Sequence, residues 1–230
     1  MAIAVVTGAS RGLGRAVAEE LASRGWSLVV DGRDSASLTE AAAAIRSRLA
    51  PGASVVAVAG DVSDAAHRRQ LVDAAVSLGG IDLFVNNAST LGATPLPGLG
   101  AYPLEELRRA VEVNVVAPLA LVQQSLAALR GAPRPAVLNI TSDASVEAYE
   151  GWGGYGLTKA ALDHLSAVLA AEEPGLRVWA VDPGDMRTQM HQDAFPGEDI
   201  SDRPRPDEVV ADLVRLVEEA PPSGRYRLSE

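Results

Sequence analysis

The chain has 230 residues, of which 47% are hydrophobic, and a formal net charge of −10 at pH 7. Its length suits one α/β domain with a sizeable core. Its negative charge argues against a nucleic-acid or membrane partner, because phosphate backbones and anionic lipids attract basic surfaces. There is no cysteine, and the three histidines are scattered, so the sequence predicts no disulfide and no metal site.

Apolar, β-branched runs alternate with helical patterns, which is typical of a doubly wound parallel sheet. Strands are predicted at residues 2–7, 27–31, 54–59, 81–86, 135–141 and 176–182, with a weaker seventh at 226–228. Helices are predicted at residues 12–24, 35–49, 64–78, 103–130, 152–172 and 206–219. The acids Asp64 and Asp207 suit first helical turns, and Pro118 should kink the fourth helix.

Residues 1–230 contain no linker or internal repeat, so we expect a single domain. Residues 189–206 carry three prolines and several charges, and we expect them to form a mobile lid. No signal-like segment precedes the first strand, and no apolar run approaches the roughly 20 residues of a membrane span. We therefore expect a cytoplasmic protein.

A glycine-rich turn follows the first apolar run. Gly8, Gly12 and Gly14 come directly after the strand, and an amphipathic helix begins near Gly12. A strand, a glycine turn and a helix N-terminus together favour a phosphate site, because free N–H groups and the helix dipole attract an anion. The spacing is G-x-x-x-G-x-G rather than the common G-x-G-x-x-G.

The same turn also fits the G-x-S-x-G pattern of serine hydrolases, with Ser10 as nucleophile and His164 or His191 as base. In that fold an earlier strand and loop supply part of the oxyanion hole. Too few residues precede Ser10 to supply them here, so this alternative is weak.

Three polar residues in the second half of the chain suggest acid–base chemistry. Tyr155 and Lys159 are four residues apart in a predicted helix, so they share one face. A phenol loses its proton near pH ~10, and a neighbouring cation lowers its pKa. Ser142 could bind the oxygen of a reacting carbonyl. An isolated Tyr-x-x-x-Lys is more often an ordinary surface pair, so the argument needs the rest of the chain.

Together these residues resemble the classical short-chain dehydrogenase/reductase family from Ile3 to about Thr188. The family-like markers, in order, are Thr7-Gly8-x-x-x-Gly12-x-Gly14, Asp61-Val62, Asn86-Asn87-Ala88, Asn114, Ser142, Tyr155-x-x-x-Lys159 and Pro183-Gly184. The resemblance implies a single-domain Rossmann oxidoreductase that uses a nicotinamide cofactor and acts on a small or medium carbonyl or alcohol.

The resemblance also implies residue roles. Tyr155 would be the general acid or base, Lys159 would lower its pKa and hold the nicotinamide ribose, and Ser142 would hold the substrate oxygen. Asn114 would hold a water in a proton relay. Cofactor contacts would come from Gly8, Ser10, Arg11, Gly12, Leu13, Gly14, Arg33, Asp61, Val62, Asn87, Ala88, Tyr155, Lys159, Pro183, Gly184, Met186 and Thr188.

The chain departs from the family pattern in two places. Ser89 stands where glycine usually follows Asn-Asn-Ala, and Asp182 stands where asparagine usually precedes Pro-Gly. Ser89 could alter the loop beside the cofactor, and Asp182 could add a charge near the site or cap a turn.

The choice between NAD and NADP depends on the end of the second strand. Asp31 is a candidate acid for the ribose 2′-hydroxyl, but the family's discriminating acid usually sits one residue later, at Gly32. Arg11 and Arg33 match positions where NADP-preferring members keep a cation. The sequence therefore favours NADP(H) over NAD(H).

Two further expectations concern the assembly and the alternative to catalysis. The helix from Gly154 to Ala171 is rich in Ala and Leu beyond one face, which favours a homodimer or homotetramer. A catalytically silent sensor or scaffold on the same fold is the main alternative to an enzyme. It would have no need of all four candidate catalytic residues.

Overall fold

The computed structural model describes residues 1–228 and contains one parallel sheet of seven strands. The strands are β1 (Ile3–Val6), β2 (Ser27–Gly32), β3 (Val55–Ala59), β4 (Leu83–Asn86), β5 (Ala136–Ile140), β6 (Arg177–Asp182) and β7 (Gly224–Arg227). Their order across the sheet is β3-β2-β1-β4-β5-β6-β7. The doubly wound fold predicted from the sequence is confirmed, including the weaker seventh strand.

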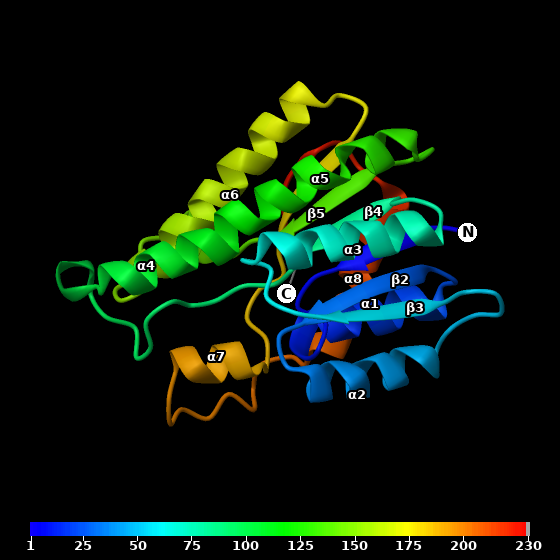
Figure 1. Cartoon of the computed structure of the whole chain (residues 1–230). Helices are drawn as coiled ribbons and strands as arrows, with labels where there is room; N and C mark the ends of the chain where they lie inside the picture. The colour runs from blue at the N-terminus through cyan, green and yellow to red at the C-terminus, as the bar shows by residue number, and fades with distance from the viewer. Residues whose placement is uncertain (229–230) are drawn as a thin grey trace.

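Helices cover both faces of the sheet (Figure 1). They are α1 (Gly12–Ser23), α2 (Ser35–Arg46), α3 (Ala65–Leu78), α4 (Leu104–Val111), α5 (Ala117–Gly131), α6 (Gly153–Glu172), α7 (Gln189–Ala194) and α8 (Pro206–Glu219). One apolar cluster joins the sheet to α1, α2 and α8, and a second joins it to α3, α5 and α6. The predicted helices are confirmed with small shifts at their ends, and α7 is an additional short helix inside residues 189–206.

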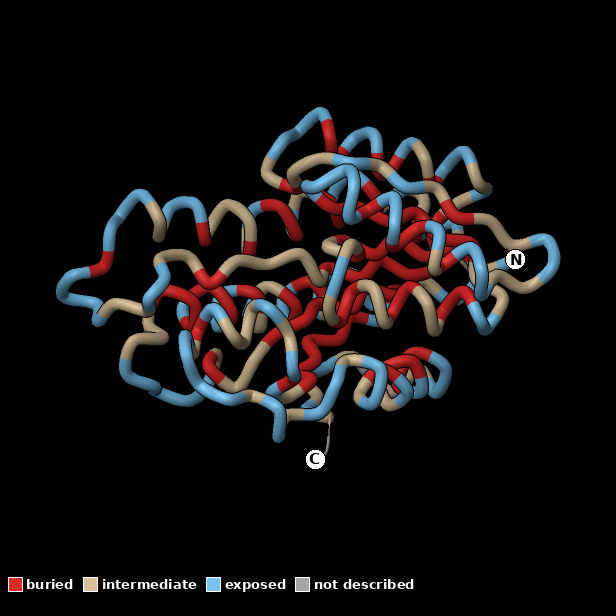
Figure 2. The backbone as a smooth tube through the Cα atoms, turned by 90° about the horizontal axis from the view of Figure 1, so that it is seen from below, coloured by how far each residue is buried: buried red, intermediate tan, exposed pale blue. Residues whose placement is uncertain are grey.

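The central strands are buried on both faces, as Figure 2 shows by the buried tube that runs through the middle of the molecule. This burial explains why residues 3–6, 28–30 and 83–85 are continuous apolar runs rather than alternating patterns. Trp179 and Phe84 are the largest of the fully buried side chains. The core therefore lies along the sheet, and loops surround the carboxyl ends of the strands.

The fourth predicted helix is interrupted. Between α4 and α5 lies η2, a π-helical segment at Glu112–Val116, and Pro118 is the second residue of α5. A proline near a helix start lacks only an N–H that has no partner within the helix. In place of the predicted kink, the structure has a π-helical segment just before Pro118. Asp64 also differs slightly from the prediction: it caps α3, accepting from the Ala66 N–H, rather than lying in its first turn.

The continuous helical stretch Leu104–Gly131 bears on the expectation that no apolar run approaches the length of a membrane span. Among the described residues it is long and apolar enough, by length and composition only, to cross a membrane, and one 18-residue window in it has a mean hydropathy of 1.3. It is not an unbroken apolar run, because charged residues such as Glu105 and Arg108 are interspersed. Here α5 packs against α3 and the sheet, and a core helix passes the same test.

The strand order places the reversal of the sheet between β1 and β4. In open α/β sheets, ligands bind outside the carboxyl ends of the strands at such a switch point. The glycine turn follows β1, residues 87–90 follow β4, Ser142 follows β5 and Pro183 follows β6. Most of the predicted site residues therefore lie on one edge of the sheet.

Candidate active site

The glycine turn has the backbone shape that the sequence predicted. Gly8 and Gly12 have φ angles of +67° and +57°, which favour glycine over other residues. A Cβ on Gly14 would lie 2.5 Å from the Gly8 carbonyl oxygen and would also meet the Asn87 side chain. Asn87 Nδ2 donates to the Thr7 and Gly8 carbonyls at 2.8 and 3.2 Å, and these two hydrogen bonds stabilise the turn.

Asp31 is used inside the protein rather than at its surface. Its carboxylate accepts the Gly8 N–H at 2.6 Å and lies 3.0 Å from His67 Nε2. Burial raises the pKa of Asp31, while the bonds from His67 and Gly8 oppose that rise. Asp31, a candidate ribose ligand from the sequence, thus already has two partners inside the protein. Through them it connects the glycine turn to β2 and α3.

The surface beside the end of β2 carries two arginines. Arg11 and Arg33 are both exposed there. Asp61 Oδ1 accepts from the Ser63 N–H and Oγ at 2.9 and 2.8 Å. Partial burial opposes these bonds, but they and the nearby charges of Arg33 and Arg109 lower the pKa of Asp61. Asp61 is therefore ionised next to one of the two arginines.

Tyr155 and Lys159 lie on one buried face of α6, as their spacing predicted. Lys159 is 3% exposed, and its Nζ lies 5.4 Å from the centre of the Tyr155 ring and donates to the Ile140 carbonyl at 2.8 Å. Burial lowers the pKa of Lys159 to about 8. Burial also raises the pKa of Tyr155, which is opposite to the direction expected from the sequence. Desolvation of the phenolate outweighs the neighbouring lysine in this structure.

Two serine hydroxyls interact with the Tyr155 phenol. Those of Ser89 and Ser142 lower its pKa by hydrogen bonding, whereas the charges of Asp182 and Asp143 raise it. Ser142 precedes a short 3₁₀ turn, η3 (Asp143–Ser145), and its Oγ accepts the Ala144 N–H at 3.2 Å. The sequence predicted Ser142 at this place, but it did not reveal that the hydroxyl of Ser89 also reaches the phenol.

Asn114 links several parts of the site. It is 1% exposed and lies in η2, where a π-helical segment is often found at a functional site. Its Oδ1 accepts from Ser89 Oγ at 3.1 Å and from the Thr90 N–H at 2.9 Å. Its Nδ2 donates to the Thr90 carbonyl at 2.8 Å and to Thr158 Oγ1 at 2.9 Å. Asn114 thus joins the loop after β4 to α6.

An apolar cluster covers Tyr155 from the side of α7. Trp152 packs edge-on against the Tyr155 ring with centroids 5.7 Å apart, and Phe195 lies 5.8 Å from Trp152. Met190 on α7 packs against the same cluster. Residues 94–95, Gln192 and Asp193 of α7, and residues 196–198 line an open groove of about 600 Å³. This groove carries polar and charged side chains, whereas the cluster that packs on the Tyr155 ring is apolar.

The loop after β6 brings the last predicted residues to the same edge. Met186 is buried, and Thr188 caps α7 by accepting the His191 N–H at 3.2 Å. A Cβ on Gly12 would lie 3.7 Å from Thr188 Cγ2, so this loop adjoins the glycine turn. The positions expected to contact a dinucleotide therefore follow the edge of the sheet from β2 to β6.

The hydrolase alternative lacks its geometry. Ser10 lies against Gly32 at the end of β2. Within residues 1–228, Ser10 makes no hydrogen bond with a histidine: His164 is exposed on α6, and His191 lies 3.7 Å from Asp185. Nothing in the described part of the chain would activate Ser10 as a nucleophile.

Comparisons with known proteins show the family to which the chain belongs. A family model described as short chain dehydrogenase matches residues 2–199. Sepiapterin reductase of Mus musculus is 36% identical over 201 residues, covering 83% of this chain and 77% of the relative. Diacetyl reductase ((S)-acetoin forming) of Staphylococcus epidermidis is 32% identical over 191 residues, covering 81% and 72%.

A solved structure is also close. The alcohol dehydrogenase from the archaeon Thermococcus sibiricus, complexed with 5-hydroxy-NADP, matches with a TM-score of 0.87 and 28% identity, covering 99% of this chain and 96% of that one. The chain belongs to the short-chain dehydrogenase family. It is an NAD(P)-dependent oxidoreductase, and the catalytically silent alternative is not supported.

Proposed function

We propose that this enzyme reduces a small or medium carbonyl compound, or oxidises the corresponding alcohol, with Tyr155 as general acid or base. The observation that carries the proposal is the buried phenol of Tyr155, which has Lys159 Nζ 5.4 Å from its ring centre and whose pKa the Ser89 and Ser142 hydroxyls lower. The raised pKa of Tyr155 keeps the phenol protonated at neutral pH, which is the form that a general acid requires.

In this mechanism each residue has a separate task. Ser142 donates a hydrogen bond to the substrate oxygen, and Tyr155 gives that oxygen its proton. Ser89 and Asn114 lie behind the phenol and form a hydrogen-bonded path from it to the backbone of Thr90. As the phenol gives up its proton, the Ser89 hydroxyl and the Lys159 charge stabilise the phenolate, while Asn114 holds Ser89 in place.

The cofactor site has a shape that fits a dinucleotide. The backbone at Gly8 and Gly12 favours glycine, and the first N–H groups of α1 lie directly after this turn. When bound, the nicotinamide cofactor supplies or accepts the hydride. The proposed contacts are Gly8, Ser10, Arg11, Gly12, Leu13, Gly14, Arg33, Asp61, Val62, Asn87, Ala88, Tyr155, Lys159, Pro183, Gly184, Met186 and Thr188.

We further propose a preference for NADP(H) over NAD(H). Arg11 and Arg33 offer exposed cations for a 2′-phosphate, and Asp31 is withdrawn from the ribose by Gly8 and His67. Replacing Arg33 with alanine should weaken NADPH binding about tenfold or more and leave NADH binding nearly unchanged, because only the 2′-phosphate needs that charge.

The measurement is a side-by-side fluorescence titration of wild type and Arg33→Ala with both nucleotides. Arg46→Ala is a matched control, because Arg46 lies in the last turn of α2 rather than at the end of β2. An unchanged ratio of the two dissociation constants in Arg33→Ala would contradict the assignment.

The apolar cluster that packs on Tyr155 indicates the class of substrate. Trp152, Phe195 and Met190 present flat or flexible apolar surface beside the phenol, and we propose that residues 189–206 act as a lid over it. The experiment is NADPH oxidation with diacetyl, sepiapterin and simple aryl ketones. Nucleotide binding without turnover of any carbonyl or alcohol would contradict the proposal.

We propose that the protein is a homodimer or homotetramer paired through α5 and α6. Val116, Leu119, Leu157 and Val168 are large apolar residues that remain exposed on or next to these helices. Replacing Leu157 and Val168 with glutamate should give a monomer, because burying an unpaired charge in an interface is costly. Light scattering at micromolar concentration would measure the mass, with Val76→Glu on α3 as a control. A wild-type monomer would contradict the proposal.

We also propose that the enzyme works in the cytoplasm without a nucleic-acid or membrane partner. The net charge of −10 supports the absence of such partners, because it repels phosphate backbones and anionic lipids.

A further inference from the structure

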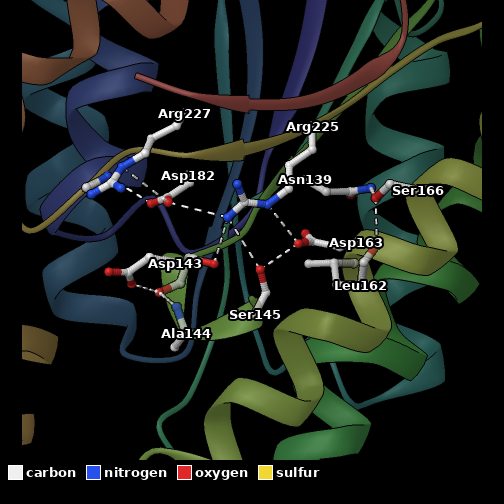
Figure 3. A network of polar contacts seen from close by, with 12 residues as sticks. Asn139, Asp143, Ala144, Ser145, Leu162, Asp163, Ser166, Asp182, Arg225 and Arg227 are labelled. Carbon is white, nitrogen blue, oxygen red and sulfur yellow. Dashed lines mark hydrogen bonds and ion pairs between the residues drawn. The ribbon is translucent and has the colours of Figure 1, made fainter. Parts of the chain in front are cut away.

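Arg225, on the edge strand β7, reaches across the end of the sheet to the turn that carries Ser142 (Figure 3). Its Nη2 donates to the Ser142 carbonyl oxygen at 3.1 Å and lies 3.4 Å from Ser145 Oγ. Its Nε donates to Asp163 Oδ2 at 3.0 Å. One planar guanidinium thus joins β7, η3 and α6, a geometry that lysine could not reproduce.

The turn held by Arg225 determines where the Ser142 hydroxyl points. The Ser142 carbonyl also accepts the Ser145 N–H at 3.1 Å, which closes the turn. On the other side of the residue, Ser142 Oγ donates to Asp143 Oδ1 at 3.0 Å. Ser145 Oγ donates to Asp163 Oδ2 at 2.6 Å, so Asp163 holds both the turn and the arginine. A shift of this turn would move Ser142 relative to Tyr155.

The same arginine faces Asp182, which stands where the family usually has asparagine. Asp182 is buried at the end of β6, and its Oδ1 accepts the Gly184 N–H at 3.1 Å. Its Oδ2 lies 3.4 Å from Arg225 and 3.9 Å from Arg227. Its negative charge raises the pKa of Tyr155. A charge that the family usually lacks therefore acts on the phenol, and arginines from β7 oppose it.

We propose that Arg225 is a positioning residue for the reaction: it holds the turn that presents Ser142 and balances the charge of Asp182 behind the site. This inference rests on the proposed function of Ser142 and Tyr155. It assigns a task to β7, which lies beyond the residues that match the family model.

The first test separates positioning from binding. Arg225→Gln should lower kcat by about tenfold or more, because small displacements of a catalytic group cost large factors in rate. The dissociation constant for NADPH should stay near that of wild type, since Arg225 lies outside the proposed nucleotide contacts. Arg225→Lys should recover only part of kcat, because the charge returns without the planar fork. Arg215→Gln, which removes an exposed arginine paired with Asp212 on α8, is the matched control.

The second test reads the charge through the pH dependence of kcat. The groups that face the phenol are the carboxylates of Asp182 and Asp143, the hydroxyls of Ser89 and Ser142, and the ammonium of Lys159. Arg225→Gln should move the tyrosine limb of the profile to higher pH, because Asp182 is then less balanced. Asp182→Asn should move the limb to lower pH. In the double variant the limb should also lie at lower pH than in Arg225→Gln alone.

The outcomes distinguish this inference from the proposed function. If Tyr155→Phe keeps its turnover, the proposed function itself fails. If Tyr155→Phe loses turnover while Arg225→Gln and Asp182→Asn match the Arg215→Gln control in kcat and pH profile, only the role of Arg225 is overturned. Should Arg225→Gln not fold, Arg225→Lys decides in its place: a partial loss of kcat supports the role of Arg225, and a kcat and pH profile equal to those of Arg215→Gln overturns it.

Discussion

Replacing Tyr155 with phenylalanine should abolish turnover while leaving the fold and nucleotide binding nearly intact. The change removes one hydroxyl from a side chain whose ring remains packed against Trp152. General acid catalysis and the fixed position of the proton donor together contribute factors of ~10² to 10⁴ or more to the rate. We therefore expect kcat to fall at least ~10³-fold.

The measurement is single-turnover NADPH oxidation with the best carbonyl substrate, together with a fluorescence titration of NADPH. Tyr226→Phe is a matched control, because it removes a phenol that bonds to the Pro222 carbonyl on the far edge of the sheet. A Tyr155→Phe variant with near-wild-type kcat would remove Tyr155 from the mechanism. A variant that fails to bind nucleotide would instead indicate that the hydroxyl is structural.

Replacing Lys159 with methionine should eliminate activity but stabilise the protein near neutral pH. Lys159 is buried, and its pKa is lowered from 10.5 to about 8. Between these values the unfolded chain binds more protons than the folded one, so the stability of the wild type rises with pH. From pH 7.5 to pH 10 the rise should be about 2 kcal/mol, and it should vanish in Lys159→Met.

Urea unfolding at half-unit pH steps would measure this slope. The range from pH 7.5 to pH 10 suits this measurement because Lys159 is the only lysine among the 230 residues. Ordinary tyrosines titrate only near pH ~10, at the upper end of this range. A flat wild-type curve between pH 8 and pH 9.5 would show that Lys159 keeps an ordinary pKa. A Lys159→Met variant that retains turnover would contradict its proposed role at the phenol.

The strands and the proposed catalytic set were accessible from sequence because each depends on local pattern. Val5 and Val29 belong to unbroken apolar runs that only a doubly covered sheet explains, and the spacing of Tyr155 and Lys159 fixes their common face on a helix. The short helix α7 was missed because six residues between prolines carry almost no periodic signal.

What could not be predicted depends on contacts between distant residues. Asp31 looked like a free acid until His67, 36 residues later, was found beside it. Ser89 looked like a minor change in a loop, although its hydroxyl joins Asn114 to the phenol. The pKa of Tyr155 depends mainly on desolvation by the whole fold. The sequence shows the neighbouring charge of Lys159 but not the extent of this desolvation.

The burial of Lys159 has a practical consequence for chemical labelling. Because nineteen arginines and one lysine make up the twenty basic residues, amine-reactive reagents find no exposed lysine on this protein. Apart from the chain terminus, acylation of a single side chain is all that such reagents can achieve. Its rate should follow the opening of the site, and bound nucleotide should slow it. Mass spectrometry of the intact protein would then follow the acylation of Lys159 as a single mass increment.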